Sequence, residues 1–238
     1  MWQPVLMICG YFISVLGIAM LFPAAFDIYY NHTNWSVFIN SSIVSIFIGL
    51  SLFLANKGKI KEFAEMLIGY EVLGCKELGV TEEIEENGTT FYENALIKAK
   101  YVCERLGVPC LADDSGLMVE CLDGAPGVYS ARYAGENATD KLNNEKLLNE
   151  MKNSQNRRAK FVSSLVLYYP DGNLLTANGE TLGEILTESQ GENGFGYDPL
   201  FFSYDLNKSF GIASDEEKNS VSHRGRALKS LVSQIQKR

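Results

Sequence analysis

The distribution of apolar and charged positions divides the chain into two unlike parts. Residues 1–55 contain no Lys or Arg and a single acidic residue, Asp27, and they include two apolar runs, 5–26 and 37–54. Each run is close to the length of a helix that spans the hydrocarbon core of a bilayer. The turn between the runs is polar and rich in aromatic residues, which suits a membrane interface. The pattern predicts a hydrophobic helical hairpin that spans a membrane, and a buried soluble hairpin is the alternative.

Positive charge begins directly after the second apolar run, with three lysines within residues 57–61. By the positive-inside rule, these lysines place the remainder of the chain in the cytoplasm. We therefore expect two domains, a hydrophobic hairpin over residues 1–55 and a second domain over residues 56–238. Membrane contact is expected through residues 5–54.

The second part alternates between helical and extended patterns. Apolar residues at helical spacing predict helices from residue 58, over residues 90–106, after Thr139 and from residue 225 onward. Short runs rich in β-formers predict strands at residues 110–112, 161–169 and 174–186, with a turn at residues 170–173. Such a mixture is typical of an α/β domain.

Composition narrows the function classes. The formal net charge is -8 and the isoelectric point is near 4.9, which argues against a broad basic surface for nucleic acid. A small anionic substrate remains compatible, because a few Lys and Arg side chains can create a local positive site. The five cysteines are scattered, without C-x-x-C spacing, so neither a disulfide framework nor a zinc site is indicated.

Two short segments carry candidate chemistry. Asp113-Asp114-Ser115-Gly116 follows the predicted strand at residues 110–112, and ligands of open α/β sheets bind at the carboxyl ends of strands. The same four residues are also ordinary turn formers. Gly58 and Lys59 stand at a predicted helix start, where free N–H groups and a cation can hold a phosphate. A solvated basic helix start is the alternative there.

Four ordered blocks of the second part resemble the inosine/xanthosine triphosphate pyrophosphatase family. The resemblance implies a mixed twisted sheet with flanking helices and a cleft between two lobes. The blocks are Asn56-Lys57-Gly58-Lys59; Thr90-Phe91-Tyr92-Glu93-Asn94-Ala95 with Lys98-Ala99; Ala112-Asp113-Asp114-Ser115-Gly116-Leu117 with residues 124–135; and Gly194-Phe195-Gly196-Tyr197-Asp198-Pro199 with Ser222-His223-Arg224-Gly225.

The resemblance also implies an activity. The family hydrolyses deaminated purine nucleoside triphosphates (ITP, dITP and XTP) to the monophosphate and pyrophosphate, which cleanses the nucleotide pool. It implies Mg²⁺ as the cofactor and a homodimer as the assembly. Splitting the bond between the α- and β-phosphates needs an activated water, a divalent cation and fixed positive charges, and the blocks contain residue types suited to these tasks.

Individual roles follow from the resemblance. Asp114 matches the general base and a metal ligand, and Glu86 matches the second acidic metal ligand, with a solvated acid within residues 82–86 as the alternative. Three lysines match positions that bind phosphate or substrate, residues 195–198 match the segment that binds the base, and a His-Arg pair matches the reader of the 6-oxo group. The expected substrate contacts are Asn56, Lys59, Lys98, Ser115, Phe195, Gly196, Tyr197, Asp198, Lys218, His223 and Arg224.

The chain departs from the family pattern before Asn56. The family has a first strand that ends in Ser/Thr, any residue, then Asn, whereas Leu54 and Ala55 stand here, so a hydroxyl that contacts phosphate is missing. Ile212 also replaces a common acid. These departures leave open an alternative function, a membrane-anchored, catalytically impaired nucleotide-binding fusion protein.

The N-terminal part has a resemblance of its own. Trp2-Gln3-Pro4-Val5-Leu6, Leu21-Phe22-Pro23-Ala24, Trp35-Ser36-Val37-Phe38 and Leu52-Phe53-Leu54-Ala55-Asn56-Lys57-Gly58 resemble the first hairpin of Trk-type potassium uptake subunits. This resemblance implies an origin for the segment and no ion transport, since the later pore segments are missing.

Overall fold

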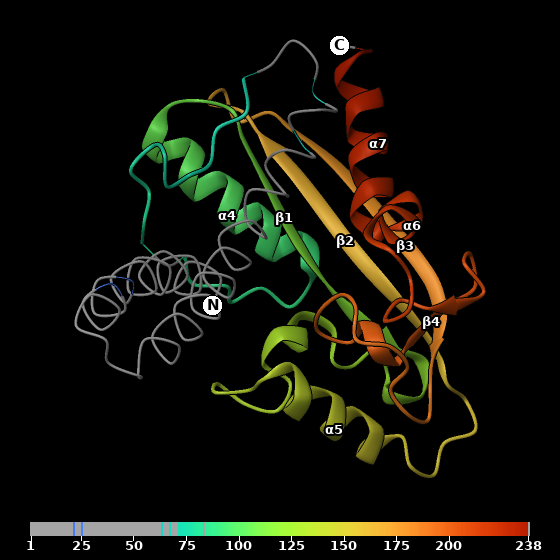
Figure 1. Cartoon of the computed structure of the whole chain (residues 1–238). Coiled ribbons are helices and arrows are strands. Elements are labelled where there is room, and N and C mark those ends of the chain that lie inside the picture. The colour runs from blue at the N-terminus through green and yellow to red at the C-terminus, as the bar shows by residue number, and fades with distance from the viewer. Residues whose placement is uncertain are drawn as a thin grey trace. The chain divides into compact units, whose positions relative to one another are not determined.

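The chain divides into two units, Met1–Gly74 and Cys75–Arg238. The predicted hairpin over residues 1–55 and most of the helix predicted from residue 58 lie outside the described residues, and the fold below is that of the second unit (Figure 1). Among the residues described, no helix is both long and apolar enough to cross a bilayer. The computed structural model describes residues 21, 25, 63, 67, 71–82 and 84–237.

A five-stranded sheet forms the centre of this unit, with its strands in sequence order. Every pairing among the described strands is antiparallel, so the predicted mixed sheet is wrong for this part of the chain. Each strand pairs with the next one along the chain, and the tight turn at residues 170–173 returns the chain antiparallel. The strands are β1 (Cys110–Val119), β2 (Arg158–Tyr168), β3 (Leu174–Ile185), β4 (Phe201–Ser203) and β5 (Lys208–Ser209).

β1 is longer than the sequence pattern predicts. The expected strand ends at residue 112, but the pairing with β2 continues through Asp113, Asp114 and Ser115 as far as Val119. The segment over residues 113–116, which both sequence interpretations placed after the strand, is therefore the middle of it, because cross-strand hydrogen bonds outweigh the local turn preference of Asp, Ser and Gly. Successive side chains of a strand point to opposite faces, so Asp114 faces one side of the sheet and its two neighbours face the other.

The helices are distributed between these two faces. α4 packs against the face that carries the even-numbered residues of β1 and β2, with Ala95 and Ala99 against Val166. α7 covers the opposite face, where a Cβ at Gly179 of β3 would lie 2.0 Å from the His223 carbonyl oxygen. Figure 1 shows α4 and α7 on opposite sides of the sheet. The helices are α4 (Phe91–Leu106), α5 (Asp140–Glu150), α6 (Asp215–Val221) and α7 (His223–Ile235).

Local signals explain where the helices begin and end. Thr90 and Glu93 form a capping box at the start of α4, and Gly107 in the left-handed region ends it, as the pattern over residues 90–106 predicts. Thr139 caps α5, which confirms that predicted start. α7 starts at His223, two residues earlier than predicted, because the Ser222 hydroxyl accepts from the Gly225 amide and acts as the cap.

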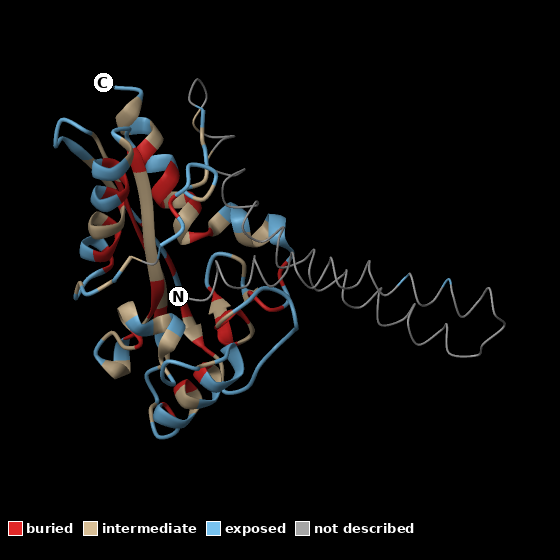
Figure 2. Cartoon of the chain, turned by 90° about the vertical axis from the view of Figure 1, so that its left-hand side faces the viewer, coloured by how far each residue is buried: buried red, intermediate tan, exposed pale blue. Residues whose placement is uncertain are grey.

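The main core lies on the α7 face, toward α5. Leu117 and Val119 of β1 pack there with Leu147 of α5 and with Phe201 and Phe210. These five side chains are fully buried, and Figure 2 shows buried residues along the sheet and the elements that adjoin it. The core fixes the positions of β1, which carries Asp114 and Ser115, and of the segment between β3 and α6, which carries residues 195–198 of the candidate site.

Candidate active site

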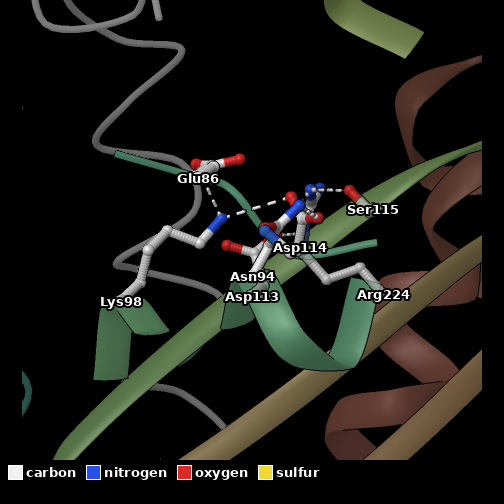
Figure 3. Close-up of polar contacts among 8 residues, drawn as sticks. Glu86, Asn94, Lys98, Asp113, Asp114, Ser115 and Arg224 are labelled. Carbon is white, nitrogen blue, oxygen red and sulfur yellow. Dashed lines mark hydrogen bonds and ion pairs between the residues drawn. The ribbon is translucent and has the colours of Figure 1, made fainter. Parts of the chain in front are cut away.

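Asp114 is the centre of a group of charged side chains on the α4 face of the sheet. The Lys98 ammonium lies 3.2 Å from Asp114 Oδ1 and 3.1 Å from Glu86 Oε1. Asn94 Nδ2 donates to Asp114 Oδ2 at 3.2 Å, and Figure 3 shows Lys98 directed at both carboxylates. We call Glu86, Asn94, Lys98 and Asp114 the acidic cluster. One ammonium serves two carboxylates here, so the cluster has an excess of negative charge that suits a further cation.

The fold explains why these side chains meet. Asn94 and Lys98 are four residues apart on α4, so both lie on the same side of the helix. That side faces β1, and Asp114 is one of the even-numbered residues of β1 on this face. Glu86 comes from the segment that leads into α4, which brings the second carboxylate to the same lysine.

Burial raises the pKa of Asp114 above its ordinary value. The nearby Lys98 charge opposes this rise, the Glu86 carboxylate adds to it, and the hydrogen bond from Asn94 opposes it. The net direction is upward, which favours proton uptake by this carboxylate. A carboxylate with a raised pKa is suited to general-base chemistry, because its affinity for a proton is closer to what water activation requires.

Arg224 binds the other two polar residues of the same strand segment. Its Nε donates to Asp113 Oδ2 at 2.9 Å, and its Nη2 lies 2.9 Å from the same oxygen in an ion pair. Nη2 also donates to Ser115 Oγ at 3.2 Å. These contacts lie on the α7 face, and Figure 3 shows Arg224 beside Ser115 and the two aspartates. Asp113 was not predicted as a site residue. It fixes the plane of the guanidinium, and the alternation of side chains along a strand is the signal that could have revealed it.

A second Lys-Asp pair lies in the segment between β3 and α6 and in α6 itself. Lys218 Nζ forms an ion pair with Asp198, whose Oδ2 also accepts from the Phe195 amide at 2.7 Å. The same ammonium lies 4.3 Å from the centre of the Phe195 ring and 5.6 Å from that of Phe210. We call Phe195, Asp198, Phe210 and Lys218 the aromatic cluster. Lys218, expected at phosphate or substrate, is bound to a carboxylate and two rings.

Exposure differs sharply within the aromatic cluster. The residue Phe195 is 65% exposed, whereas the Asp198 side chain is only 3% exposed. Burial raises the pKa of Asp198, and the Lys218 charge opposes this rise. The structure therefore presents an open aromatic face above a buried ion pair, an arrangement on which a planar ring can stack.

The neighbours of Phe195 anchor this segment. Tyr197 is buried, and its hydroxyl donates to the Ser130 carbonyl at 2.9 Å, so it contacts the protein core. The Gly196 amide donates to Asp140 Oδ2 at 2.7 Å, and its carbonyl accepts from Asn144 Nδ2 at 2.9 Å. A hollow of about 430 Å³ lies between α5 and this segment. Asp114 does not line it, so a cleft shared by both clusters stays a prediction.

His223 is the first residue of α7 and lies on the face of the sheet that α7 covers. Its ring stacks on Phe161 of β2, with the ring centres 5.2 Å apart, and Phe161 in turn stacks on Phe210 at 6.1 Å. Arg224, the next residue, contacts β1. The predicted His-Arg pair therefore extends from the aromatic cluster to the strand that carries the acidic cluster.

Comparison with known sequences decides the family. The sequence model described as the Ham1 family matches residues 50–234, which is most of the chain. This chain belongs to the Ham1 family. It is 50% identical over 186 residues to the dITP/XTP pyrophosphatase of Haemophilus influenzae, covering 76% of this chain and 95% of that protein. It is 47% identical over 180 residues to the dITP/XTP pyrophosphatase of Bacillus subtilis, covering 74% and 91%.

Solved structures agree with this assignment. The Staphylococcus aureus Ham1 protein has a TM-score of 0.73 and 43% identity, covering 76% of this chain and 94% of its own. A Ham1 protein from Coxiella burnetii has a TM-score of 0.72 and 39% identity over the same shares of the two chains. The resemblance of the N-terminal part to Trk-type potassium uptake subunits receives no support from these comparisons.

The structure of this Ham1-family chain places the predicted site residues in three sets. Glu86 and Lys98 meet Asp114, Arg224 meets Ser115, and Lys218 meets Asp198 beside Phe195. Asn56 and Lys59 lie outside the described residues. Four residues that hold these sets in place were given no role from the sequence, namely Asn94, Asp113, Asp140 and Asn144. Asn94 and Asp113 stand within the quoted family blocks, and that position is the signal that could have found them.

Proposed function

We propose that this chain hydrolyses deaminated purine nucleoside triphosphates, namely dITP, XTP and ITP, to the monophosphate and pyrophosphate, and so cleanses the nucleotide pool. The observation that carries the proposal is the acidic cluster, in which Lys98 bridges Glu86 and Asp114. The relatives named dITP/XTP pyrophosphatase support the choice of substrate, since the chain shares about half of its aligned residues with them.

The proposed reaction is an attack of water on the α-phosphorus. Asp114 accepts a proton from the water, the new oxygen–phosphorus bond forms, and the bond from the α-phosphorus to the bridging oxygen breaks. The electron pair of that bond leaves with pyrophosphate. The Lys98 ammonium stabilises negative charge that develops on the phosphate oxygens, because fixed positive groups cost no reorganisation during the reaction.

The donors of the acidic cluster fit Mg²⁺. Carboxylate oxygens suit this ion, which is usually bound by one or two carboxylates together with substrate phosphates and water. Within residues 71–82 and 84–237, no three His, Cys, Asp or Glu side chains form a group of metal ligands. Water, together with the substrate phosphates when they are present, would supply the remaining ligands of the proposed ion. Glu86 and Asp114 would hold it. When bound, the ion neutralises polyphosphate charge and polarises the α-phosphate.

The aromatic cluster is the proposed site of the base. The exposed Phe195 ring offers a stacking surface, and Gly196 and Tyr197 hold that ring in place through their contacts with α5 and Ser130. We assign His223 and Arg224 to the 6-oxo group of hypoxanthine or xanthine. Adenine presents an amino group at that position, and a donor facing a donor is left unpaired, which disfavours adenine.

The deciding experiment measures pyrophosphate release by the full chain from dITP, ITP and XTP, with dATP, ATP and GTP as controls, in the presence and absence of Mg²⁺. We expect Mg²⁺-dependent release from the deaminated nucleotides at a kcat/KM at least tenfold above that for ATP, on the order of one well-placed hydrogen bond. Equal rates with ATP, or release without a divalent cation, would contradict the proposal.

Three further proposals rest on sequence alone. Residues 1–55 form a membrane-spanning hairpin with the domain over residues 56–238 in the cytoplasm, and the chain is a homodimer. Fractionation of cells that express the full chain tests the first, since a carbonate-resistant membrane fraction is expected. Protection of the domain from a protease added outside intact spheroplasts tests its cytoplasmic location. Light scattering of the purified chain tests the third by its mass.

A further inference from the structure

Asn94 is the most deeply buried polar residue of the acidic cluster. Its side chain is fully inaccessible to solvent, although an amide is costly to bury unless its hydrogen bonds are made. The described contacts include one at each end of the amide. Its Nδ2 donates to Asp114 Oδ2 at 3.2 Å, and its Oδ1 accepts from the Gly88 backbone amide at 2.9 Å. One side chain therefore joins β1 to the segment that carries Glu86.

The Gly88 segment is held tightly against the start of α4. A Cβ at Gly88 would lie 2.7 Å from Asn94 Oδ1 and 2.6 Å from the Glu93 Cβ, so a side chain here would force the segment away. The Glu93 carboxylate accepts from the backbone amides of Thr89 and Thr90, at 2.6 and 3.0 Å. Glu86 is thus two residues from Gly88, whose backbone amide is held by Asn94. Asn94 is also the residue that contacts Asp114.

We infer that Asn94 is a positioning residue that sets the distance between the carboxylates of Glu86 and Asp114, and through this distance the affinity of the site for a divalent cation. The inference rests on the proposed function only in that it takes the acidic cluster as the cation site. Asn94 itself bonds to the protein and not to the cation. Its effect is exerted through the two carboxylates.

The amide is the group that this position requires. Asn offers a donor and an acceptor at the ends of a short, stiff side chain, whereas Asp offers no donor when ionised and Ala offers neither. Lys98, one helical turn further along α4, adds the ion pair to both carboxylates. Lys98 attracts both carboxylates electrostatically, whereas Asn94 fixes their positions through hydrogen bonds. Without Asn94, both carboxylates are still paired with Lys98, but their spacing is no longer fixed.

The test measures binding of Mn²⁺ alone to the full chain by electron paramagnetic resonance, with no nucleotide present. We expect Asn94→Ala to weaken Mn²⁺ affinity by roughly tenfold to a hundredfold, the range seen when a residue that orients metal ligands is removed. Asn143→Ala is the matched control. Asn143 is also a buried asparagine, 3% exposed, but its contacts are with Ser130, Ala131 and Ala134. We expect Mn²⁺ affinity to be unchanged in it.

A second variant guards against a loss of folding. Asn94→Ser keeps a polar group that is too short to reach both Gly88 and Asp114, and we expect the same direction of change together with faster hydrogen exchange at the Gly88 amide. Glu86→Gln, made with and without Asn94→Ser, measures the energetic coupling between these two residues. In the otherwise wild-type chain, Glu86→Gln should weaken Mn²⁺ binding strongly. In the Asn94→Ser chain this loss should be at most half as large, because the segment that carries Glu86 is already released.

The inference is overturned if wild-type protein binds no Mn²⁺, if both Asn94 variants bind it as wild type does, or if Asn143→Ala loses as much affinity as they do. These measurements use no nucleotide. A chain that releases no pyrophosphate from dITP would therefore defeat the proposed function, and the Mn²⁺ comparison would still decide the role of Asn94.

Discussion

Two Lys-Asp pairs in this chain have the same composition and different surroundings. Lys98 and Asp114 lie beside a second carboxylate, that of Glu86, and all three side chains retain 14% to 29% exposure. Lys218 and Asp198 lie beside aromatic rings, and their side chains are 14% and 3% exposed. Burial raises the pKa of both aspartates and a lysine opposes the rise in both, so the pairs differ by their neighbours and not by their own chemistry.

The neighbours decide which partner each pair can accept. In the acidic cluster, two carboxylates share one ammonium, and the excess negative charge favours a cation and the phosphates that the cation attracts. In the aromatic cluster, the charges balance and an exposed ring covers them, which favours a flat, uncharged ligand. A nucleoside triphosphate has both parts, the phosphates that a cation attracts and a flat, uncharged base. The comparison therefore assigns the phosphates and the base to different ends of the site.

The largest expected effect separates the two aspartates. Asp114→Asn should lower kcat for dITP by about 10²- to 10⁴-fold, since the general base is lost. Asp198→Asn should act mainly on KM, because Asp198 supports the base site. Steady-state pyrophosphate release measures both. A wild-type kcat in Asp114→Asn would show that the pair of Lys98 and Asp114 is no more catalytic than the pair of Lys218 and Asp198.

The next effect concerns the exposed ring. Phe195→Ala should raise KM for dITP roughly 5- to 150-fold at nearly constant kcat, from the typical cost of losing one base-aromatic stack. Tyr204→Ala is the control, because Tyr204 is also an exposed aromatic residue, 50% exposed, with its hydroxyl near Glu184. A similar rise in KM in both variants would show that exposed rings in general, and not Phe195, account for the change.

A smaller effect is expected at Arg224, the arginine that Asp113 holds against β1. Asp113→Asn removes the charge that fixes Arg224, and we expect the preference for dITP over dATP to fall roughly tenfold, the scale of one charge-assisted hydrogen bond. Arg226, also on α7, forms a matched ion pair at 2.9 Å with Asp205, which lies between β4 and β5. Asp205→Asn should leave the preference unchanged, and an equal loss in both variants would contradict a specific role for Asp113.

The smallest effect is on stability against pH. Because the pKa of Asp198 is raised in the folded state, the folded chain takes up this proton more readily than the unfolded chain. The contribution of Asp198 is therefore greatest below the ordinary value of 3.8 and is lost as pH rises through the raised pKa. Urea unfolding of wild type and Asp198→Asn at a series of pH values should show the wild-type advantage decrease with pH. A stability advantage of wild type over Asp198→Asn that grows with pH would mean that folding lowers the pKa of Asp198 and does not raise it.

The sequence predicted local features well and missed those that depend on strand pairing. The helix over residues 90–106, the helix start after Thr139 and the turn at residues 170–173 are marked by signals within a few residues, and the structure confirms them. The extension of β1 through Asp113 and Asp114 was missed, because the hydrogen bonds that make these residues a strand come from β2, far along the chain. Sequence preference alone treats acids and glycine as a turn.

The same limitation explains the residues missing from the predicted site. Asn94 occupies a buried position on α4 and shares that side of the helix with Ala95 and Ala99, so its pattern indicates core packing. Only the placement of α4 on β1 reveals that its amide faces Asp114. The lysine and the two carboxylates of the acidic cluster were found through family resemblance, since residues 86, 98 and 114 have no spacing in the chain that would mark them as neighbours.

Asp113, Asp114 and Ser115 lie within a paired strand, so whether a residue number is odd or even decides which face of the sheet its side chain occupies. A deletion or insertion of one residue in the first half of β1 would exchange the two aspartates, turning the proposed base toward α7 and the arginine partner toward α4. Such a change would leave the Asp113-Asp114-Ser115 motif intact in the sequence, but it would abolish the proposed hydrolysis. Length variation in this family should therefore be absent from β1 and confined to the loops on either side of it.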